Sequence, residues 1–456
     1  MVQKRGGIAV LSLVAVVVVA VISSAAGAAP GDLDPSFGSG GKVVNGDFGW
    51  GEAVLVQPNG KIVVGGASDG GDFALARYTP DGALDPVFDG DGTVTTDFGL
   101  GDSVSAIAFR PGYLVAAGIS SQLPPSGHFA VARYRLDGSL DPMFDGDGKV
   151  AVNFGARSAY CRDLAVQPDG KIVVVGAIEP DSSSGFSFAL ARFNQDGSLD
   201  PSFGTGGLVI TDLGGPNDGA QAVALQSDGR IVVAGRTGNI GPSDFAVVRY
   251  ETNGALDPSF DEDGKATIDF GGDEEASEVV LQTDGKILVV GATGSLATGQ
   301  DFALARLNTD GSLDTQGLDP FIDAPFGTAG KVVTDFDGEE DQATSVILEP
   351  NGNILVAGPV SRPVSGVDSD FGLARYRIDG SLDPSFGVGG KVTTAVTASE
   401  DRPHDLTLQR DGRIVVAGPV IELIDGELES DLALVRYLVR GCCFGDGKPP
   451  GPPPLP

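Results

Sequence analysis

The sequence consists of one unit repeated seven times, and this self-similarity limits the possible folds more than any other feature. The leucine of a Leu-Asp-Pro segment recurs at a mean spacing of about 58 residues, at Leu33, Leu84, Leu140, Leu199, Leu256, Leu318 and Leu382. Two further markers follow in constant order, represented by Gln57 to Val64 and Asp72 to Tyr78 in the first complete unit. Such a chain folds as a repeat architecture, in which each unit buries its apolar face against its neighbours.

Each unit predicts four short β-strands. In the first complete unit, runs of β-branched and aromatic residues cover residues 52–57, 61–65, 72–78 and 93–98. The third run alternates bulky side chains (Phe73, Leu75 and Arg77) with alanines, so that identical sheets can stack around an axis. We therefore predict an all-β fold, a seven-bladed β-propeller of four-stranded blades.

The two ends of the repeat region are complementary. The first repeat material, Gly41 to Phe48, matches the fourth strand of a unit, and the last, Asp431 to Tyr437, matches the third. We expect the N-terminal strand to pair with the C-terminal blade and close the ring, which removes two exposed sheet edges. An open β-solenoid is the alternative, because stacked repeats also bury shared faces.

The N-terminal residues 1–28 are typical of a signal peptide. Lys4 and Arg5 precede an apolar run at 8–22, and Ala26-Gly27-Ala28 offers a cleavage site. The alternative is an uncleaved anchor, although the run is short for a membrane span. We expect a secreted or cell-surface protein with no membrane span after cleavage.

The propeller is expected to span residues 32–437, and residues 438–456 are expected to form a flexible proline-rich tail. Cys161 lies at the start of the first strand of its unit, while Cys442 and Cys443 are predicted to follow the opposite face several blades away. An internal bridge to Cys161 is therefore not expected. An intermolecular disulfide and a bond between the two tail cysteines both stay open.

The repeat pattern resembles a known family. Leu-Asp-Pro-Ser-Phe-Gly, then Gln-Pro-Asp-Gly-Lys-Ile-Val-Val, then Asp-Phe-Ala-Leu-Ala-Arg-Tyr is similar to the delta-60 repeat of bacterial secreted and surface proteins. The resemblance covers nearly all of residues 32–437 and implies a β-propeller. It brings no catalytic residues, because the family has no assigned activity. The second marker is broken at Arg110-Pro111-Gly112, and the turn from Leu313 to Phe326 is enlarged.

Composition excludes several function classes. The chain has 62 acidic and 30 basic residues and a formal net charge of −32, which argues against nucleic-acid binding. Two histidines and three cysteines leave little material for a zinc site or a cysteine protease. No Gly-x-Ser-x-Gly, phosphate-loop or His-Glu-x-x-His motif is present. His128 and His404 lie in different units, and we expect them to be solvated or capping residues.

One arginine recurs at the same position of every unit, at Arg77, Arg133, Arg192, Arg249, Arg306, Arg375 and Arg436. A catalytic arginine is needed once, whereas a residue that stabilises a blade is needed in each blade. The aspartate of Leu-Asp-Pro, such as Asp200, is the expected partner in a bidentate pair. A ring of anion-binding sites is the alternative interpretation.

The predicted topology gives the ring two different faces. The turns after the first and third strands carry uniform sequences and define the constant face; the other connections vary in length and define the variable face, where binding is expected. The candidate binding residues are acidic: Asp273, Glu274, Glu275, Glu339, Glu340, Asp341, Glu400 and Asp401. A repeated aspartate precedes these loops at Asp47, Asp97, Asp212, Asp269 and Asp335. These acids would hold a cation or a basic partner, or form a solvated rim.

Calcium is the only cofactor that the motifs suggest. Six aspartates lie two residues apart in pairs within glycine-containing turns: Asp89 and Asp91, Asp145 and Asp147, Asp261 and Asp263. Alternate carboxylates can point at one cation, but the distal glutamate of an EF-hand loop is not aligned with these turns.

The sequence favours a non-catalytic scaffold that binds an extracellular protein or glycan. A propeller-based hydrolase or lyase, a calcium-binding surface protein and a mainly structural protein are the alternatives, and the fold alone does not separate them. We assign no catalytic residue. A unique pair of carboxylates buried in the central channel would favour an enzyme, and a large exposed apolar patch would favour a scaffold.

Overall fold

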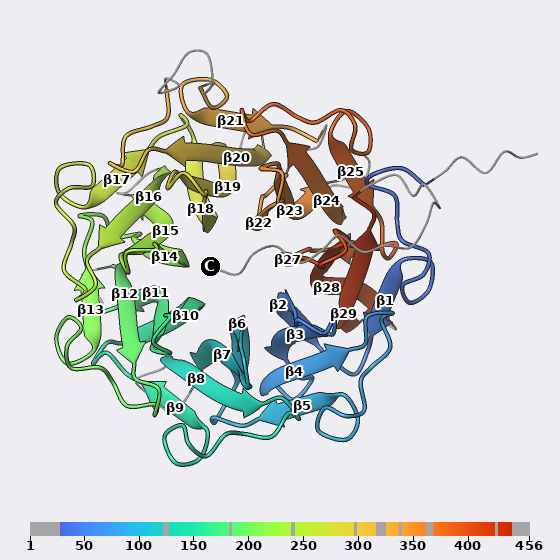
Figure 1. Cartoon of the computed structure of the whole chain (residues 1–456), viewed down its shortest axis with the longest axis horizontal. Coiled ribbons are helices and arrows are strands. Elements are labelled where there is room, and N and C mark those ends of the chain that lie inside the picture. The colour runs from blue at the N-terminus through green and yellow to red at the C-terminus, as the bar shows by residue number, and fades with distance from the viewer. Residues whose placement is uncertain are drawn as a thin grey trace, which may run out of the picture.

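The computed structural model describes residues 28–121, 127–181, 185–238, 242–295, 299–315, 325–336, 340–361, 368–424 and 427–439. Seven antiparallel sheets stand around a central axis as the blades of a propeller (Figure 1). The predicted fold class is confirmed. Within the described residues no helix is long and apolar enough to cross a membrane.

Each blade runs from an inner strand at the axis to an outer strand at the rim. Blade 1 holds β2 (Trp50–Val56), β3 (Ile62–Ala67), β4 (Phe73–Tyr78) and β5 (Thr93–Thr96). Blade 2 holds β6 (Asp102–Arg110), β7 (Tyr113–Ser120), β8 (His128–Arg135) and β9 (Lys149–Val152). Blade 3 holds β10 (Ser158–Val166), β11 (Ile172–Glu179), β12 (Ser187–Phe193) and β13 (Leu208–Thr211). Blade 4 holds β14 (Gly219–Leu225), β15 (Ile231–Gly238), β16 (Ser243–Tyr250) and β17 (Lys265–Ile268).

The remaining blades follow the same order. Blade 5 holds β18 (Asp273–Leu281), β19 (Ile287–Ser295), β20 (Gly299–Leu307) and β21 (Lys331–Thr334). Blade 6 holds β22 (Ser345–Leu348), β23 (Ile354–Ser361), β24 (Ser369–Tyr376) and β25 (Lys391–Thr394). Blade 7 has an inner strand in two pieces, β26 (Glu400–Asp401) and β27 (Asp405–Leu408), followed by β28 (Ile414–Ile424) and β29 (Glu427–Tyr437).

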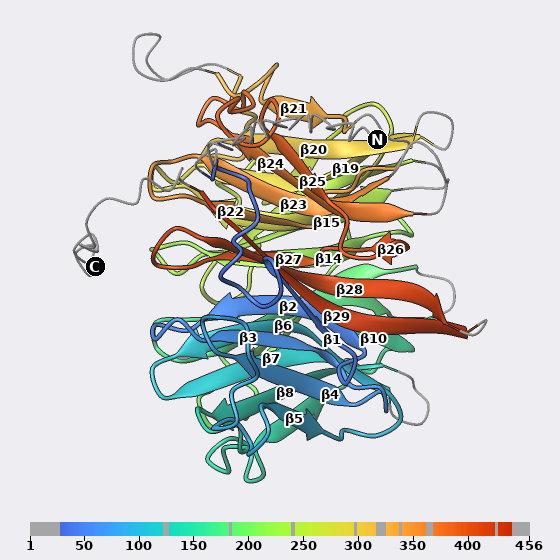
Figure 2. The same ribbon diagram turned by 90° about the vertical axis from the view of Figure 1, so that its right-hand side faces the viewer.

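The outer strand of blade 7 comes from the other end of the chain. Strand β1 (Lys42–Asn45) pairs antiparallel with β29, with Lys42 opposite Val435. Figure 2 shows this strand beside the C-terminal blade. An isolated bridge between Leu33 and Tyr437 extends the junction. The predicted ring closure is therefore present, and a closed ring replaces the open solenoid.

The core lies between neighbouring blades. On one side of blade 1, Phe73 and Leu75 pack with Val104 and Leu114 of blade 2, and all four side chains are at most 1% exposed. On its other side, the alanines of β4 pack against β28 and β29 of blade 7. A bulky face thus meets a small face at each junction, as the alternation in the third strand predicts.

The recurring arginines stabilise the blades from the constant face. Each pairs with one aspartate over 2.6–2.9 Å: Arg77–Asp85, Arg133–Asp141, Arg192–Asp200, Arg249–Asp257, Arg306–Asp314, Arg375–Asp383 and Arg436–Asp34. In six pairs this is the aspartate of a Leu-Asp-Pro segment. In the fifth unit it is Asp314 of Leu313-Asp314-Thr315, because Leu313 takes the place in the fold that the sequence pattern assigned to Leu318, which lies outside the described residues. The guanidinium also stacks on the phenylalanine that follows, and we call each set of three an arginine cluster. In blade 3 the distance from Arg192 to the Phe203 ring centroid is 4.4 Å.

Each arginine cluster joins two units. Arg192 donates from Nη1 to the carbonyl oxygen of Thr252 in the next unit (2.5 Å), and its Nε contacts Oδ2 of Asp200. The other oxygen of Asp200 accepts the Ser202 amide (3.0 Å) instead. The pair expected from the sequence is present, but it uses one carboxylate oxygen and is not bidentate, because the second oxygen is needed to cap the turn.

The predicted terminal segments fall mostly beyond the described part of the chain. Residues 1–27 of the predicted signal peptide, and residues 440–456 of the predicted tail with Cys442 and Cys443, lie outside the described residues. Cys161 is described as a buried free thiol. It lies on β10 and packs into the core between blades 2 and 3.

Candidate functional site in the central channel

Three of the acids predicted for a binding surface are buried caps. Glu274, Asp341 and Asp401 are at most 1% exposed; Glu274 and Asp401 lie at the start of an inner strand, and Asp341 lies just before one. Asp341 accepts the Phe336 amide (2.7 Å) and Asp401 accepts the Val396 amide (2.6 Å), while Glu274 accepts the Gly272 amide (2.5 Å). These carboxylates satisfy backbone donors within the fold.

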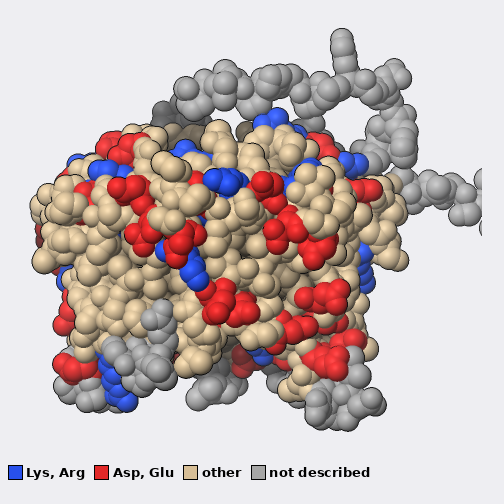
Figure 3. Space-filling model, turned by 90° about the horizontal axis from the view of Figure 1, so that it is seen from below, with Lys and Arg blue, Asp and Glu red and all other residues tan. Residues whose placement is uncertain are grey.

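Three of the other predicted surface acids also have partners for their carboxylates within the chain. Asp273 accepts the Ser243 amide (2.8 Å), Glu275 pairs with Arg236 (3.0 Å), and Glu400 pairs with Arg402. Glu340 is exposed and its carbonyl accepts the amide of Ser361, whereas Glu339 lies outside the described residues. Figure 3 shows Asp and Glu spread over one side of the ring with Lys and Arg among them.

The paired turn aspartates predicted for calcium lie on the constant face. Their second members, Asp91, Asp147 and Asp263, accept backbone amides two residues later (2.8–3.0 Å). Their first members, Asp89, Asp145 and Asp261, have φ between 44° and 50° and form the turn itself. Among the described residues, no third His, Cys, Asp or Glu completes a group of ligands there.

The inner strands of the blades stand around the axis of the ring (Figure 1), and we call the space lined by their side chains the central channel. In blades 1 to 5 the inner strand carries a β-bulge, and the register with the next strand shifts by one residue. The bulged residue of each of these five blades lines a cavity of about 340 Å³ at the axis, as do Thr344 of blade 6 and His404 of blade 7. The residue after the bulge also lines it in blades 1, 2, 3 and 5, whereas Ala222 of blade 4 packs in the core.

The residue type at the position after the bulge, and at the corresponding position of blades 6 and 7, differs among the blades. Blades 1 to 7 carry Ala53, Ala106, Asp163, Ala222, Glu278, Ser345 and Asp405 at this position. Alanine or serine is therefore replaced by a carboxylic acid in blades 3, 5 and 7. The cavity lining includes Asp163, Glu278 and Asp405, which converge from three sides of the ring.

Two of these acids also connect neighbouring blades. Asp163 Oδ2 accepts the Val223 amide of blade 4, and Asp405 Oδ2 accepts the Val54 amide of blade 1, both over 2.7 Å. Glu278 accepts the Val279 amide of its own strand (2.8 Å). Asp163 and Asp405 are thus partly structural, whereas Glu278 makes no comparable hydrogen bond to another blade within the described part of the chain.

The channel shifts the protonation of its acids. Desolvation raises the pKa of Glu278 well above its usual value, and the charges of Asp163 and Asp405 raise it further. Desolvation likewise raises the pKa of Asp163, with a contribution from Asp405. It raises the pKa of Asp405 to about 6, even though Val54, Ser345 and Leu406 donate hydrogen bonds to that carboxylate. Near neutral pH the channel therefore retains protons that ordinary carboxylates would have released.

A second group of functional side chains lies where blades 7 and 1 meet. Glu52 is half-buried at the bulge of β2, and desolvation raises its pKa, but the charge of Arg162 and a hydrogen bond from Trp50 oppose this shift. The Trp50 ring contacts His404 edge-on, with ring centroids 5.8 Å apart. Burial lowers the pKa of His404 to about 4, so its imidazole is neutral at pH 7.

The sequence did not identify this site. His404 was expected to be solvated or capping, but it lines the cavity directly before β27; His128 lies elsewhere and contacts Asn153 (3.2 Å). One signal would have found the three acids. Asp163, Glu278 and Asp405 each precede the first residue of the second marker by four positions, where the other units carry alanine or serine.

The large apolar side chains that are most exposed lie singly on different blades. Val388, Leu428 and Met143 are 85%, 76% and 75% exposed and belong to blades 6, 7 and 2. Such isolated exposure is normal for a soluble surface.

Comparison with known protein families supports the β-propeller fold but assigns no activity to the chain. Six stretches match the family model "Domain of unknown function (DUF5122) beta-propeller", at residues 57–88, 112–144, 167–203, 226–260, 282–316 and 349–386. No curated protein matches the chain.

Several solved structures are similar in outline. A protein of unknown function from Dyadobacter fermentans DSM 18053 has 11% identity and a TM-score of 0.45, over 89% of this chain and all of its own. A polysaccharide lyase described as an ulvan lyase has 12% identity and a TM-score of 0.47, over 88% of this chain and 96% of its own. Drosophila Plexin A in complex with Semaphorin 1b has 12% identity and a TM-score of 0.46, over 89% and 87%. Similarity at this level supports no statement about activity, ligand or partner. The informative comparison is the match between six stretches of the chain and the β-propeller family model.

Proposed function

We propose that this protein is an exported glycoside hydrolase that cleaves a neutral polysaccharide at its central channel. The observation that carries the proposal is the convergence of Asp163, Glu278 and Asp405 in one cavity, at a position where the remaining blades have alanine or serine. Pairs of carboxyl groups whose environments separate their pKa values are the means by which enzymes cleave glycosidic bonds.

The environments of two glutamates suggest distinct roles. Glu278 is desolvated beside two like charges, which keeps it protonated and suits a general acid that donates to the leaving oxygen. Desolvation raises the pKa of Glu52 as well, but the charge of Arg162 and a hydrogen bond from Trp50 limit this rise, so that Glu52 is the better candidate of the two for a base or a nucleophile. The two residues come from blades 5 and 1 and line the same cavity.

His404 and the neighbouring Trp50 suit the recognition of a sugar. Neutral His404 lines the cavity and can donate or accept a hydrogen bond with a hydroxyl group. The half-buried Trp50 contacts His404 and offers an apolar ring of the kind on which a pyranose packs. The channel holds four carboxyl groups and one arginine, Arg162, in its lining. This excess of acidic side chains disfavours the binding of a polyanionic polysaccharide. We therefore propose hydrolysis of a neutral glycan in preference to β-elimination next to a uronate.

The proposal rests on further expectations from the sequence. The predicted signal peptide supports export to the medium or the cell surface, and the repeat pattern supports membership of the delta-60 group. The partner would be an extracellular glycan. The second candidate is a non-catalytic scaffold that binds through the variable face, which the acidic loops of that face favour.

The proposal is tested with the mature chain and a panel of neutral and acidic polysaccharides. We expect release of reducing ends from a neutral polymer, without the ultraviolet absorbance of an unsaturated uronate. Glu278→Gln should reduce the rate by at least about 100-fold, as expected for loss of a general acid, while the sugar is still bound. Glu52→Gln should cause a loss of similar size.

Glu251→Gln on the constant face is the matched control, since this residue is distant from the channel and partly exposed. It should leave the rate unchanged. Hydrolysis by Glu278→Gln at the rate of the unsubstituted protein would contradict the proposal. Glycan binding with no turnover, abolished by substitutions in the variable loops and not by those in the channel, would establish the scaffold in its place.

A further inference from the structure

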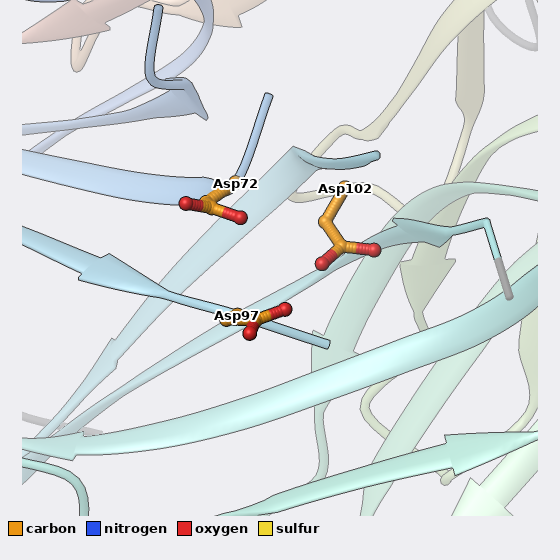
Figure 4. Close-up of side chains that lie close together, drawn as sticks. All are labelled: Asp72, Asp97 and Asp102. Carbon is orange, nitrogen blue, oxygen red and sulfur yellow. The ribbon is translucent and has the colours of Figure 1, made fainter. Parts of the chain in front are cut away.

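A group of three acids recurs at junctions between blades on the variable face. Each group takes one acid beside the start of a third strand, one after the outer strand of the same blade, and one from the start of the next blade. The groups are Asp72, Asp97 and Asp102; Asp244, Asp269 and Glu274; and Asp301, Asp335 and Asp341. We call them the junction triplets. Figure 4 shows the first, with carboxylates from three segments facing a common space.

The spacing within each triplet fits one cation. One oxygen from each residue lies within 4.8 Å of one oxygen from each of the other two. Two oxygens on opposite sides of a calcium ion are separated by about twice the Ca–O distance of roughly 2.4 Å, which gives the same upper limit. Three carboxylates at this separation repel one another unless a cation or protons neutralise them.

The middle triplet contains a buried oxygen without a donor. Glu274 is 1% exposed, and its Oε1 accepts the Gly272 amide (2.5 Å) and the Thr293 hydroxyl (3.1 Å). Its Oε2 has no hydrogen-bond partner among the described residues, and the carboxylate of Asp244 lies in direct contact with Glu274. A buried carboxylate oxygen that faces a second carboxylate requires either a shared proton or a metal ion.

We propose that the junction triplets bind calcium ions and that each ion connects two neighbouring blades. Carboxylate oxygens are the ligands that calcium prefers, and a triplet leaves coordination positions for water and carbonyl groups. A single shared proton would neutralise one of three charges, whereas a divalent cation neutralises two. This inference is independent of the proposed hydrolase activity.

Two of the four remaining junctions supply natural controls. Between blades 2 and 3, His128 and Asn153 take the first two positions and bond to each other. Between blades 3 and 4, Ser187 replaces the first acid, and Asp218 caps the Leu213 amide (2.7 Å) beside Asp212. The described residues bring no group of three acids together at either junction. Calcium should therefore bind at the three triplets and not at these two junctions.

The experiment is calorimetric titration of calcium into the mature chain after treatment with EDTA and dialysis. We expect a stoichiometry of three ions and a higher melting temperature with calcium. Asp269→Asn should reduce the stoichiometry by one, because it removes a charged ligand from the middle triplet. This variant can fold, since Asp269 is exposed and asparagine retains an acceptor for the Gly271 amide (2.6 Å).

Two further variants make the result specific. Asp212→Asn at the incomplete junction should leave the stoichiometry at three. A double variant of the constant-face turn, Asp89→Asn with Asp91→Asn, should also leave it unchanged, and a decrease there would move the calcium sites to the turns. Absence of heat and of any melting shift in the stripped, unsubstituted protein would overturn the proposal. In that case Glu274 and Asp244 would share a proton in place of binding a metal ion. Asp244→Asn, which removes one of the two repelling carboxylates, should then raise the melting temperature in the absence of calcium.

Discussion

The arginine clusters and the channel wall are both built from one residue position in every blade, but they differ in how that position varies. The arginine, its aspartate and its phenylalanine recur in all seven blades with similar geometry. The channel position is alanine or serine in four blades and a carboxylic acid in three. Uniform positions serve the stability of the ring, whereas positions that depart from the repeat are free to serve a single site.

The two regions also shift their carboxyl groups in opposite directions. Burial alone would raise the pKa of Asp257, but hydrogen bonds from Ser259 and the charge of Arg249 lower it to about 2. In the channel, desolvation raises the pKa of Asp405 to about 6, because its hydrogen bonds do not outweigh the cost of ionisation. Arginine-cluster acids are thus stabilised as anions, and channel acids are held closer to neutrality.

The largest effect should come from breaking an arginine cluster. Arg192→Met keeps much of the side-chain volume but leaves Asp200 buried with fewer counter-charges, and it removes the bond to Thr252. We expect the free energy of unfolding to fall by about 3–5 kcal/mol, measured by urea denaturation. Arg157→Met, at a side chain that is 62% exposed, is the control and should change it by less than about 0.5 kcal/mol. Equal stability of the two variants would refute the structural role.

The pH dependence should have opposite signs in the two regions. The unfolded chain releases the proton of Asp405 near the ordinary aspartate pKa of 3.8, but the native state retains it to about pH 6. The native state therefore binds more protons in this interval, and the free energy of unfolding should fall as the pH rises from about 4 to 6. Asp405→Asn should reduce this loss by roughly 2 kcal/mol, less than the full shift because the channel is partly solvated.

The acid of an arginine cluster should give the reverse result. Asp257 stays ionised in the native state down to about pH 2, so its stabilising contribution should be lost as the pH falls from about 4 toward 2. Denaturation curves of Asp257→Asn and Asp405→Asn across the pH range distinguish the two regions. A steeper decline between pH 4 and 6 in Asp405→Asn than in the unsubstituted protein would contradict the channel assignment.

A smaller effect is expected at a hydrogen bond between blades. The Tyr376 hydroxyl of blade 6 lies 2.9 Å from the Thr334 hydroxyl on the outer strand of blade 5. Tyr376→Phe should lower the free energy of unfolding by about 1 kcal/mol, because the buried Thr334 loses its partner. The double variant with Thr334→Val should recover part of this loss. A loss as large as that of Arg192→Met would mean that the blades depend on more than the arginine clusters.

Much of the fold follows from the repeat, while the channel site does not. Alternation of Phe73 and Leu75 with alanines predicts the packing between blades, and the recurrence of Arg192 and its equivalents predicts an ion pair in each blade. The channel acids are harder to predict, because the bulge beside Arg162 changes which side chains of β10 face inward. Strand alternation alone misplaces such residues, and His404 lies in the break between β26 and β27, the two pieces of one inner strand.

The variable face shows the same limit. Asp269 and Asp335 were predicted as part of a repeated acidic rim, and each lies beside acids from two other segments. The sequence does not reveal that Glu274 is buried with an oxygen that lacks a donor, because this depends on how two blades meet. Contacts between repeats decide the chemistry of this face, and they are formed only when the ring closes.

The most direct test of the distinction between uniform and variable positions is Glu278→Ala at pH 7, assayed for both melting temperature and glycan hydrolysis. Alanine is the residue that blades 1, 2 and 4 carry at this position, at Ala53, Ala106 and Ala222. If Glu278 serves catalysis, the variant should melt at the same or a higher temperature and lose its hydrolytic activity. A variant that melts well below the unsubstituted protein, or that hydrolyses the glycan at an unchanged rate, would contradict the assignment of the channel as the functional site.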